Sequence, residues 1–327
     1  MSDPVQSLNT LNYSGMLFNS GNVRTPLLSM IGGRRGITNS HEFVMGQNYA
    51  TEDGVIPNIS ETASLTAPEP TSVTRTQDTN VTQIFQETVY VSDAKLSNYG
   101  ALAGANIAGQ TGNPINELDF QIGAKMAKIG RSIEKTFING TYNKATDDTK
   151  VNKTRGLIAG ITTNTLAGGG DALSIYLVDQ IVQKIYDKNG DIDDLCLWLK
   201  PAQIQQLINN AIELGVKVGD FREDYYGLRV RDLLLNDTIV HIVKGVELPD
   251  GTALVLNVNA IRPMEQPVPG KGNFYYEALA RTGAGEKGQI FGQIGLDYAN
   301  ELFHGKITGL ATTASAPVGM KVQIASV

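Results

Sequence analysis

Residues 117–140, ELDFQIGAKMAKIGRSIEKTFING, decide the fold, because they carry the longest regular helical period in the chain. Steps of 4, 4, 3, 4 and 4 separate the large apolar residues Leu118, Ile122, Met126, Ile129, Ile133 and Phe137. Such spacing predicts an amphipathic helix with one buried face. We place the helix at 115–140, with Asn113 and Pro114 as N-cap and first-turn proline and Gly140 as its stop. At 1.5 Å per residue, residues 117–140 alone would span roughly 36 Å.

Two glycines lie inside this predicted helix, at Gly123 and Gly130. Each costs the helix ~1 kcal/mol relative to alanine. Because they are seven residues apart, they share one face of the helix. Two interpretations remain open: a neighbouring backbone packs closely against that face, or the helix can bend there.

The composition indicates a folded protein with little charge. Of its 327 residues, 41% are hydrophobic, 18% are charged and 35 are glycine. This length allows about two domain-sized units. The net charge is −6 and the longest basic run is Arg34–Arg35. A nucleic-acid reader needs a positive surface, so sequence-specific binding to nucleic acid is not expected.

The sequence shows no signal for export or for a membrane anchor. Its first ten residues, MSDPVQSLNT, have neither a basic region nor an apolar run. No apolar stretch approaches the ~20 residues of a membrane span. Cys196 is the only cysteine, which excludes a disulfide within the chain and a cysteine metal cluster. We expect a protein that is made and folded in a cytoplasm.

Residues 1–36 form an N-terminal arm without a sustained period. The stretch 12–36, NYSGMLFNSGNVRTPLLSMIGGRRG, mixes polar residues and glycine with a few apolar ones. By itself it cannot bury its larger apolar side chains, which are Leu17, Phe18, Leu27 and Leu28. We therefore expect the arm to lie on another surface.

Residues 37–92 indicate a long, polar β-hairpin. Residues 71–77, TSVTRTQ, and 80–92, NVTQIFQETVYVS, are rich in β-branched residues in near-alternation, which is typical of strands. Turn and breaker residues fill 53–70, DGVIPNISETASLTAPEP. A two-stranded hairpin is marginal in water. It must pack on its own domain or on a neighbouring chain.

Residues 173–261 alternate between helix and strand patterns. A helix is expected at 173–188, capped by Asp171 or Ser174, and another over PAQIQQLINNAIEL, closed by Gly215. Between them, DLCLWLK (194–200) is a continuous apolar run, as in a strand buried on both faces. TIVHIVKG and ALVLNVNA add two more strands. The block is therefore predicted to be an α/β subdomain.

No catalytic constellation stands out. His41, His241 and His304 lie in unrelated contexts, and His241 is interpreted as a satisfied histidine within a strand. AGANIAGQTG (103–112) has the glycine spacing of a phosphate loop, but Gln110 stands where its lysine must be. The loop LAGGGD before a helix could bind an anion, although a plain loop is favoured.

The segment DKNGDIDD (187–194) resembles the start of a calcium loop. Asp187, Asn189 and Asp191 match its first three ligand positions, but Ile192 replaces the turn glycine and Trp198 the bidentate glutamate. A polar turn is the favoured interpretation. We therefore expect no catalytic, metal or cofactor site.

Four segments together resemble one known family. NVTQIFQETVYVS followed by residues 117–140 is similar to the extended-loop strand and long spine helix of tailed-bacteriophage major capsid proteins, which have the Hong Kong 97-type fold. TRGLIAGI (154–161) is similar to the segment that leaves the spine, and LWLKPAQIQQL (197–207) to a strand and helix of the axial domain. ALARTGAGEKGQIFGQIGLDYANELFHGKITGL (278–310) is similar to the closing strands. The resemblance covers about residues 37–310.

The resemblance implies an α+β Hong Kong 97-type capsid fold that divides the chain into five parts. They are an N-terminal arm (1–36), an extended loop (37–92), a peripheral domain (93–172 and 262–310, with the spine helix at 115–140), an α/β axial domain (173–261) and a C-terminal tail (311–327).

The implied function is a shell protein that assembles with copies of itself, as pentamers and hexamers, into an icosahedral head around a phage genome. Partners for the arm and the long hairpin would then come from neighbouring copies. The candidate structural and interface residues are Leu17, Phe18, Leu27, Leu28, Arg34, Arg35, Arg75, Ile84 and Phe85. Gly123 and Gly130 are a candidate spine hinge. Portal and scaffolding proteins, a decoration protein and non-specific contact with packaged DNA are further implied partners, and no membrane is expected.

Some members of the resembled family weld their shells with bonds between a lysine of the extended loop and an asparagine of a neighbour. Lys95 is the first lysine of this chain, so residues 37–90 contain none. We expect no such bond from this loop.

Three other functions are alternatives, of which a β-rich binding module on a virion surface is disfavoured by the long helix. An encapsulin-type nanocompartment shell has the same fold but encloses cargo enzymes. An α/β enzyme built on 173–261 would need a clustered polar site, which the sequence does not show.

Overall fold

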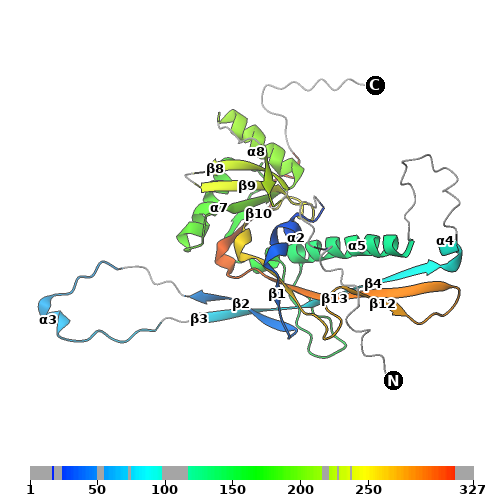
Figure 1. Cartoon of the computed structure of the whole chain (residues 1–327). Helices are drawn as coiled ribbons and strands as arrows, with labels where there is room; N and C mark the ends of the chain where they lie inside the picture. Colours follow the sequence, from blue (N-terminus) through cyan, green and yellow to red (C-terminus); the bar gives the residue numbers. More distant parts are fainter. Residues whose placement is uncertain are drawn as a thin grey trace, which may run out of the picture.

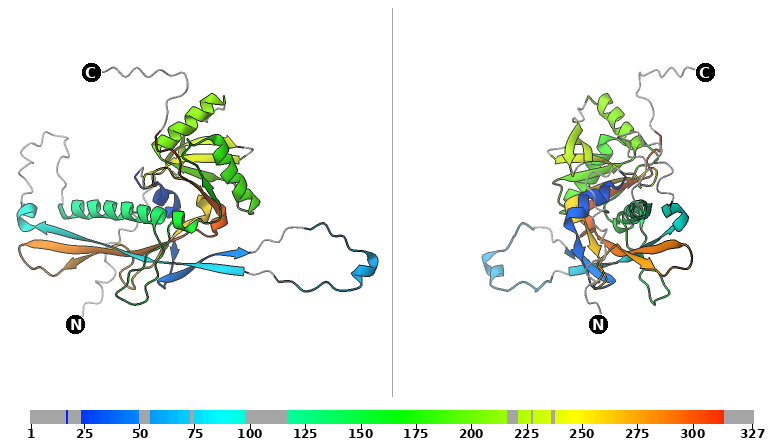
Figure 2. Two further views of the ribbon diagram at one scale, coloured as in Figure 1. Left: turned by 180° about the vertical axis from the view of Figure 1, so that it is seen from behind. Right: turned by 45° about the vertical axis from the view of Figure 1, so that its right-hand side comes forward.

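The computed structural model describes residue 17 and residues 24–49, 55–72, 75–97, 117–215, 221–226, 228–235 and 238–313. The long helix α5 (Glu117–Asn139) lies across the middle of the molecule (Figure 1). A five-stranded sheet runs beneath it, and a seven-stranded sheet with two helices stands on its other side. A hairpin projects far from the body, at the end opposite to α4 (Asp93–Ser97; Figure 2).

Helix α5 confirms the predicted apolar stripe. Ile122, Met126, Ile129, Ile133 and Phe137 are all buried, and the helix packs on the long strands of the five-stranded sheet. The stripe therefore forms the centre of the larger hydrophobic core. The predicted N-cap at Asn113 and Pro114 lies outside the described residues.

The five-stranded sheet is built around its longest strand. The strands are β1 (Gly36–Ile37), β11 (Arg262–Glu265), β13 (Gly285–Asp297) and β12 (Tyr275–Leu279), with β4 (Gln83–Ser92) on the other side of β13. The pairing of β4 with β13 is antiparallel and runs continuously from Gln83–Ile294 to Ser92–Gly285. This ladder makes the sheet long and narrow, and the sheet lies beneath α5.

The seven-stranded sheet forms a second core. Its spatial order is β5 (Thr165–Ala167), β14 (His304–Thr308), β10 (Ala253–Asn257), β6 (Leu195–Leu199), β9 (Thr238–Lys244), β8 (Leu228–Leu235) and β7 (Phe221–Tyr225). Helices α7 (Ile175–Asp187) and α8 (Pro201–Glu213) cover one face. All five residues of β6 are buried, as the apolar run 194–200 predicted. Ser174, and not Asp171, caps α7 by accepting the amide proton of Leu177 at 3.3 Å.

Two short strands correct the predicted axial boundaries. β5 and β14 belong to the seven-stranded sheet, although both lie outside 173–261. Strand β10 is fully buried and has β6 on one side, so its other edge needs a partner, which β14 supplies. The His304–Gly305 pair, expected among the peripheral closing strands, therefore lies in the axial sheet.

The projecting loop in the structure is also shorter than the predicted range 37–92. Strand β2 (Glu42–Tyr49) pairs with β3 (Arg75–Val81), but the next strand, β4, joins the five-stranded sheet. Its buried side chains Phe85, Val89 and Val91 face the larger core. Its backbone pairs with β13 along the whole strand. The projecting hairpin therefore ends at Val81.

The described part of the N-terminal arm packs on its own subunit. Helix α2 (Pro26–Ile31) is buried at all six positions, and Leu17 is 4% exposed. Leu17, Leu27 and Leu28 all belong to the larger core of this same chain. The expectation that neighbouring copies must cover these side chains is therefore wrong. Phe18 lies outside the described residues.

Candidate assembly surfaces

The tip of the projecting hairpin, residues 55–72, exposes every residue to solvent. Its large apolar side chains are far from any core: Val55 is 85% exposed, Ile56 90%, Ile59 69% and Leu65 84%. A clustered set of exposed apolar side chains is typical of an interaction surface. We call residues 55–72 the loop tip.

Local hydrogen bonds give the loop tip its shape. Ser60 caps the one-turn helix α3 (Glu61–Ser64), and its hydroxyl accepts the amide proton of Ala63 at 3.1 Å. Ser64 in turn donates to the carbonyl of Glu61 at 2.7 Å. The tip is therefore organised by polar contacts, while its apolar side chains have no cover within the described part of the chain.

The base of the hairpin is fixed to the body by Asn80, which is fully buried. Its side-chain amide donates to the carbonyls of Leu296 at 2.7 Å and Arg155 at 3.1 Å, and its oxygen accepts from the amides of Val81 and Arg155. A β-carbon at Gly295 would lie 2.6 Å from the ring of Phe43 and 2.8 Å from the carbonyl oxygen of Val81. The hairpin is therefore anchored at its base by close packing.

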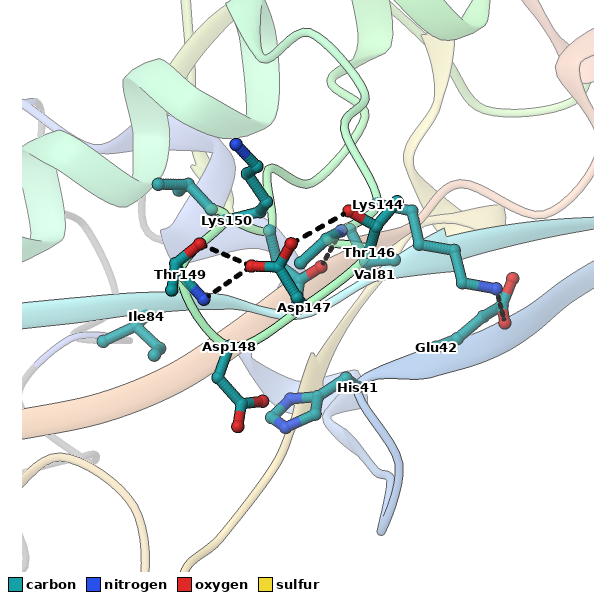
Figure 3. Close-up of a pocket in the computed structure, with 13 residues that line it drawn as sticks. His41, Glu42, Val81, Ile84, Lys144, Thr146, Asp147, Asp148, Thr149 and Lys150 are labelled. Atoms are coloured by element: carbon teal, nitrogen blue, oxygen red, sulfur yellow. Dashed lines mark hydrogen bonds and ion pairs between the residues drawn. The ribbon is translucent and has the colours of Figure 1, made fainter.

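A cavity of about 610 Å³ opens beside this base, between the start of β2 and the loop at residues 144–152 (Figure 3). Lys144 pairs with Glu42 at 2.6 Å, and this bond, with one from Thr79, lowers the pKa of Glu42. Asp147 is occupied by its own turn, because it accepts from the amide of Thr149 at 2.9 Å. The cavity therefore has a rim of mixed charge on which Glu42 and Asp147 already have partners within the described residues.

The comparisons with known proteins identify the family of the chain. A family model described as "SU10 major capsid protein" matches residues 3–311. The chain belongs to the SU10 major capsid protein family. It is therefore a structural protein of a tailed-phage virion with the Hong Kong 97-type fold, and it assembles with copies of itself. No curated protein sequence gives a significant match.

Solved structures share the fold at low sequence identity. The cyanophage A-1(L) capsid chain is 14% identical, with 89% of this chain and 94% of that chain covered and a TM-score of 0.61. The chain of Mycobacterium phage Cain is 15% identical, with 95% and 98% covered and a TM-score of 0.55. The holo-SrpI encapsulin from Synechococcus elongatus PCC 7942 is 10% identical, with 91% and 92% covered and a TM-score of 0.59. The fold alone does not separate phage shells from encapsulins, whereas the family match does.

In this capsid protein the two glycines of α5 have different surroundings. A β-carbon at Gly123 would meet nothing within 4 Å, so no backbone of the described chain packs there. Gly130 is buried, and its β-carbon would lie 3.7 Å from a methyl of Leu17. On the outer face, Phe120 is 55% exposed. The interpretation of close backbone packing therefore fails at Gly123 within a single subunit.

The axial domain carries further exposed apolar side chains: Tyr176, Tyr186, Ile212, Leu214, Leu234 and Ile239. Leu234 and Ile239 are direct cross-strand partners at the end of the β8–β9 hairpin. They lie near one edge of the seven-stranded sheet, where β8 and β9 are followed only by β7.

His241 is a satisfied core histidine, as the strand pattern indicated. It is 3% exposed, and its ring nitrogens lie 2.6 Å from Asp232 and 3.0 Å from Asp194. Asn259 donates to Asp194 at 3.1 Å and accepts from Arg34 at 2.7 Å. The network therefore ties the N-terminal arm to the axial sheet, and Arg34 contributes inside its own subunit.

The remaining candidate residues divide between core and surface. Arg35 lies 3.5 Å from Glu265, and Phe85 is buried at 8% exposure. Ile84 is 55% exposed on the rim of the cavity and stays an interface candidate. The side chain of Arg75 lies outside the described residues.

The sequence did not predict the burial of Asn80 and Glu134, two of the buried polar residues. Nothing in their local patterns sets them apart, because their partners are distant in sequence. Within the described part of the chain, no helix combines the length and apolarity of a membrane span, and no three His, Cys, Asp or Glu side chains are placed to hold a metal ion.

Proposed function

We propose that the loop tip is the main joint between copies of this capsid protein in a shell of pentamers and hexamers. The supporting observation is that Ile56, Ile59 and Leu65 are exposed on a rigidly anchored hairpin that reaches well beyond its own subunit. Covering such side chains is favourable by ~25 cal/mol per Å² of apolar area. A second copy with an apolar surface is the partner that a repeating shell supplies.

The experiment compares two doubly substituted full-length proteins, each co-expressed with the other head proteins of its virus. Ile56→Asp with Ile59→Asp places two charges on the apolar joint and should abolish shells in electron micrographs. Thr62→Asp with Thr66→Asp is the matched control, because it adds equal charge to the same loop without removing apolar surface. Normal shells from the isoleucine variant would contradict the proposal, provided that the wild type and the control assemble.

We also propose that the shell is held without covalent bonds from this hairpin. Lys95, the first lysine of the chain, lies in α4 and pairs with Glu117 at 3.6 Å, far along the sheet from the loop tip. Non-covalent interlocking or a decoration protein would then supply the strength. Denaturing gels of mature particles should show a single band, and a ladder of cross-linked species would refute this.

Portal and scaffolding proteins and non-specific contact with packaged DNA complete the proposal, together with the absence of enzymatic activity. A net charge of −6 suits a wall that must not hold its DNA tightly. The encapsulin alternative rests on the shared fold alone and has no support from the family match, so it is the weaker one. The contents of purified particles test it: DNA agrees with the phage head, and a protein cargo without DNA would contradict it.

A further inference from the structure

A carboxyl group lies buried in the C-terminal half of α5. Glu134 is 0% exposed, because it lies on the buried, mostly apolar face of the helix. Its two carboxyl oxygens accept the main-chain amide protons of Leu27 at 2.8 Å and Leu28 at 2.9 Å. These two residues are more than 100 positions away in the chain. Glu134 therefore joins the N-terminal segment directly to the spine of the same subunit.

These two bonds provide acceptors for backbone amides of α2 that have no partner within the helix itself. The first amides of a helix have no partner within the helix, and Pro26 has no amide hydrogen to donate. The preceding residue, Thr25, makes no side-chain cap. Since α2 is buried at every position, unbonded amides there would be costly. The carboxyl group of Glu134 is the acceptor that makes this burial possible.

Gly130 lies one helical turn before Glu134 and provides room on the same face of α5. A β-carbon there would lie 3.7 Å from Leu17 and 4.0 Å from the methyl of Thr25, which is ordinary contact for a methyl group. Any larger side chain would occupy the place of Leu17. A glycine that admits the arm and a carboxyl that binds it are thus adjacent on one helical face.

We propose that Gly130 and Glu134 form a clasp that holds the N-terminal segment on its own subunit before and after assembly. Glu134 acts here as a positioning residue for the arm. This proposal goes beyond the proposed shell joint and does not depend on it, because it concerns the single chain.

Burial of the clasp also changes the acidity of its carboxyl group. Burial raises the pKa of Glu134 to about 8, against the opposing effect of the two amide bonds, and the charge of Glu247 raises it further.

The main test uses Glu134→Gln in the full-length, unassembled protein. An amide side chain offers one acceptor oxygen for two donors, so one amide of α2 loses its partner. Hydrogen exchange at Leu27 and Leu28 should become at least tenfold faster, and trypsin should cut after Arg24, next to the buried Thr25. Emission from Trp198, which is 1% exposed in the axial domain, checks that the rest of the fold is intact.

The matched control is Glu87→Gln. Glu87 also contacts α5, through Lys125 at 3.0 Å and through Lys128, and it makes no bond to the described part of the arm, residues 17 and 24–36. This control should leave exchange at Leu27 and Leu28 within twofold of wild type. Wild-type protection in Glu134→Gln would overturn the clasp.

A further variant keeps the proposal testable if Glu134→Gln does not fold. Gly130→Leu should increase hydrogen exchange at Leu27 and Leu28 at least tenfold, because the larger side chain would displace Leu17 and Thr25, while Gly130→Ala should leave it within twofold of wild type. Unchanged protection in Gly130→Leu would show that Gly130 is not part of the clasp.

Discussion

Helix α2 and the loop tip both carry large apolar side chains in segments without a helical or strand period, yet these side chains have opposite surroundings. Leu27 and Leu28 are 0% exposed inside their own subunit, whereas Ile56 and Leu65 are 90% and 84% exposed. The difference lies in the polar groups. α2 has a buried acceptor in Glu134 for two of its amides, while the loop tip makes local hydrogen bonds through Ser60 and Ser64. Apolar content therefore shows that a segment needs cover, and the backbone partners decide which chain provides it.

The largest expected effect separates the two segments directly. Leu28→Ala should lower the free energy of unfolding of the isolated subunit by about 2–5 kcal/mol, because it leaves a cavity in a packed core. Leu65→Ala should change it by less than about 0.5 kcal/mol, because Leu65 makes no core contact in the subunit. Urea unfolding of both variants measures this. Equal losses would mean that the loop tip also packs on its own subunit.

The next effect concerns the base of the hairpin. Asn80→Ala should cost about 3 kcal/mol, because it leaves several buried amide and carbonyl groups without partners. Gln86→Ala is the control, since Gln86 bonds only to Gln289 on the exposed side of the sheet, and it should cost less than about 0.5 kcal/mol. A small loss for Asn80→Ala would show that the hairpin is not anchored there.

A third prediction uses pH to single out α2. The pKa of Glu134 is about 8 in the folded protein, above its usual 4.5, so the folded state holds a proton that the unfolded state has released. The free energy of unfolding should therefore fall as pH rises through this range. Burial lowers the pKa of His304 to about 4, which has the opposite effect below pH 6.5.

The informative window is thus pH 6.5 to 8, where Glu134 acts and His304 does not. Unfolding of the wild type should become easier with pH across this window, and Glu134→Gln should remove that slope. Carboxyl groups with lowered pKa, such as Glu87 and Glu301, act below about pH 4.5 and do not interfere. A wild-type stability that rises from pH 6.5 to 8 would contradict the assignment.

The smallest effect concerns the possible hinge in α5. Gly123→Ala should stabilise the subunit by about 0.5–1 kcal/mol, because its β-carbon meets nothing and alanine favours helix. If bending at Gly123 and Gly130 is needed when a shell expands, the double alanine variant should assemble but expand poorly. Assembly and expansion equal to wild type, seen by electron microscopy, would refute the hinge.

Local patterns in the sequence predicted much of the fold. The apolar stripe of α5 and the continuous run of β6 reflect contacts that repeat along one element, so their periods are visible in the residues themselves. The exposed hairpin was also predicted, because its polar, turn-rich stretch cannot form a core.

Pairings between distant segments were not visible in the same way. β14 joins the seven-stranded sheet because it pairs with the edge of β10 that β6 leaves unpaired. No residue of HGKIT (304–308) indicates this partner. The arm was predicted to need another copy because its partner, Glu134, is one acidic residue within a long helix. Assembly surfaces share this limit: Ile84 and Phe85 are neighbours in one strand, yet only Phe85 is buried.

Hydrogen exchange of the full-length protein, first as dilute subunits and then as shells, tests the central claim most directly. The account predicts that residues 25–31 are protected in both states, and that residues 55–65 become protected only in shells. Protection of residues 55–65 in the dilute subunit, or loss of protection in 25–31 until assembly, would contradict it.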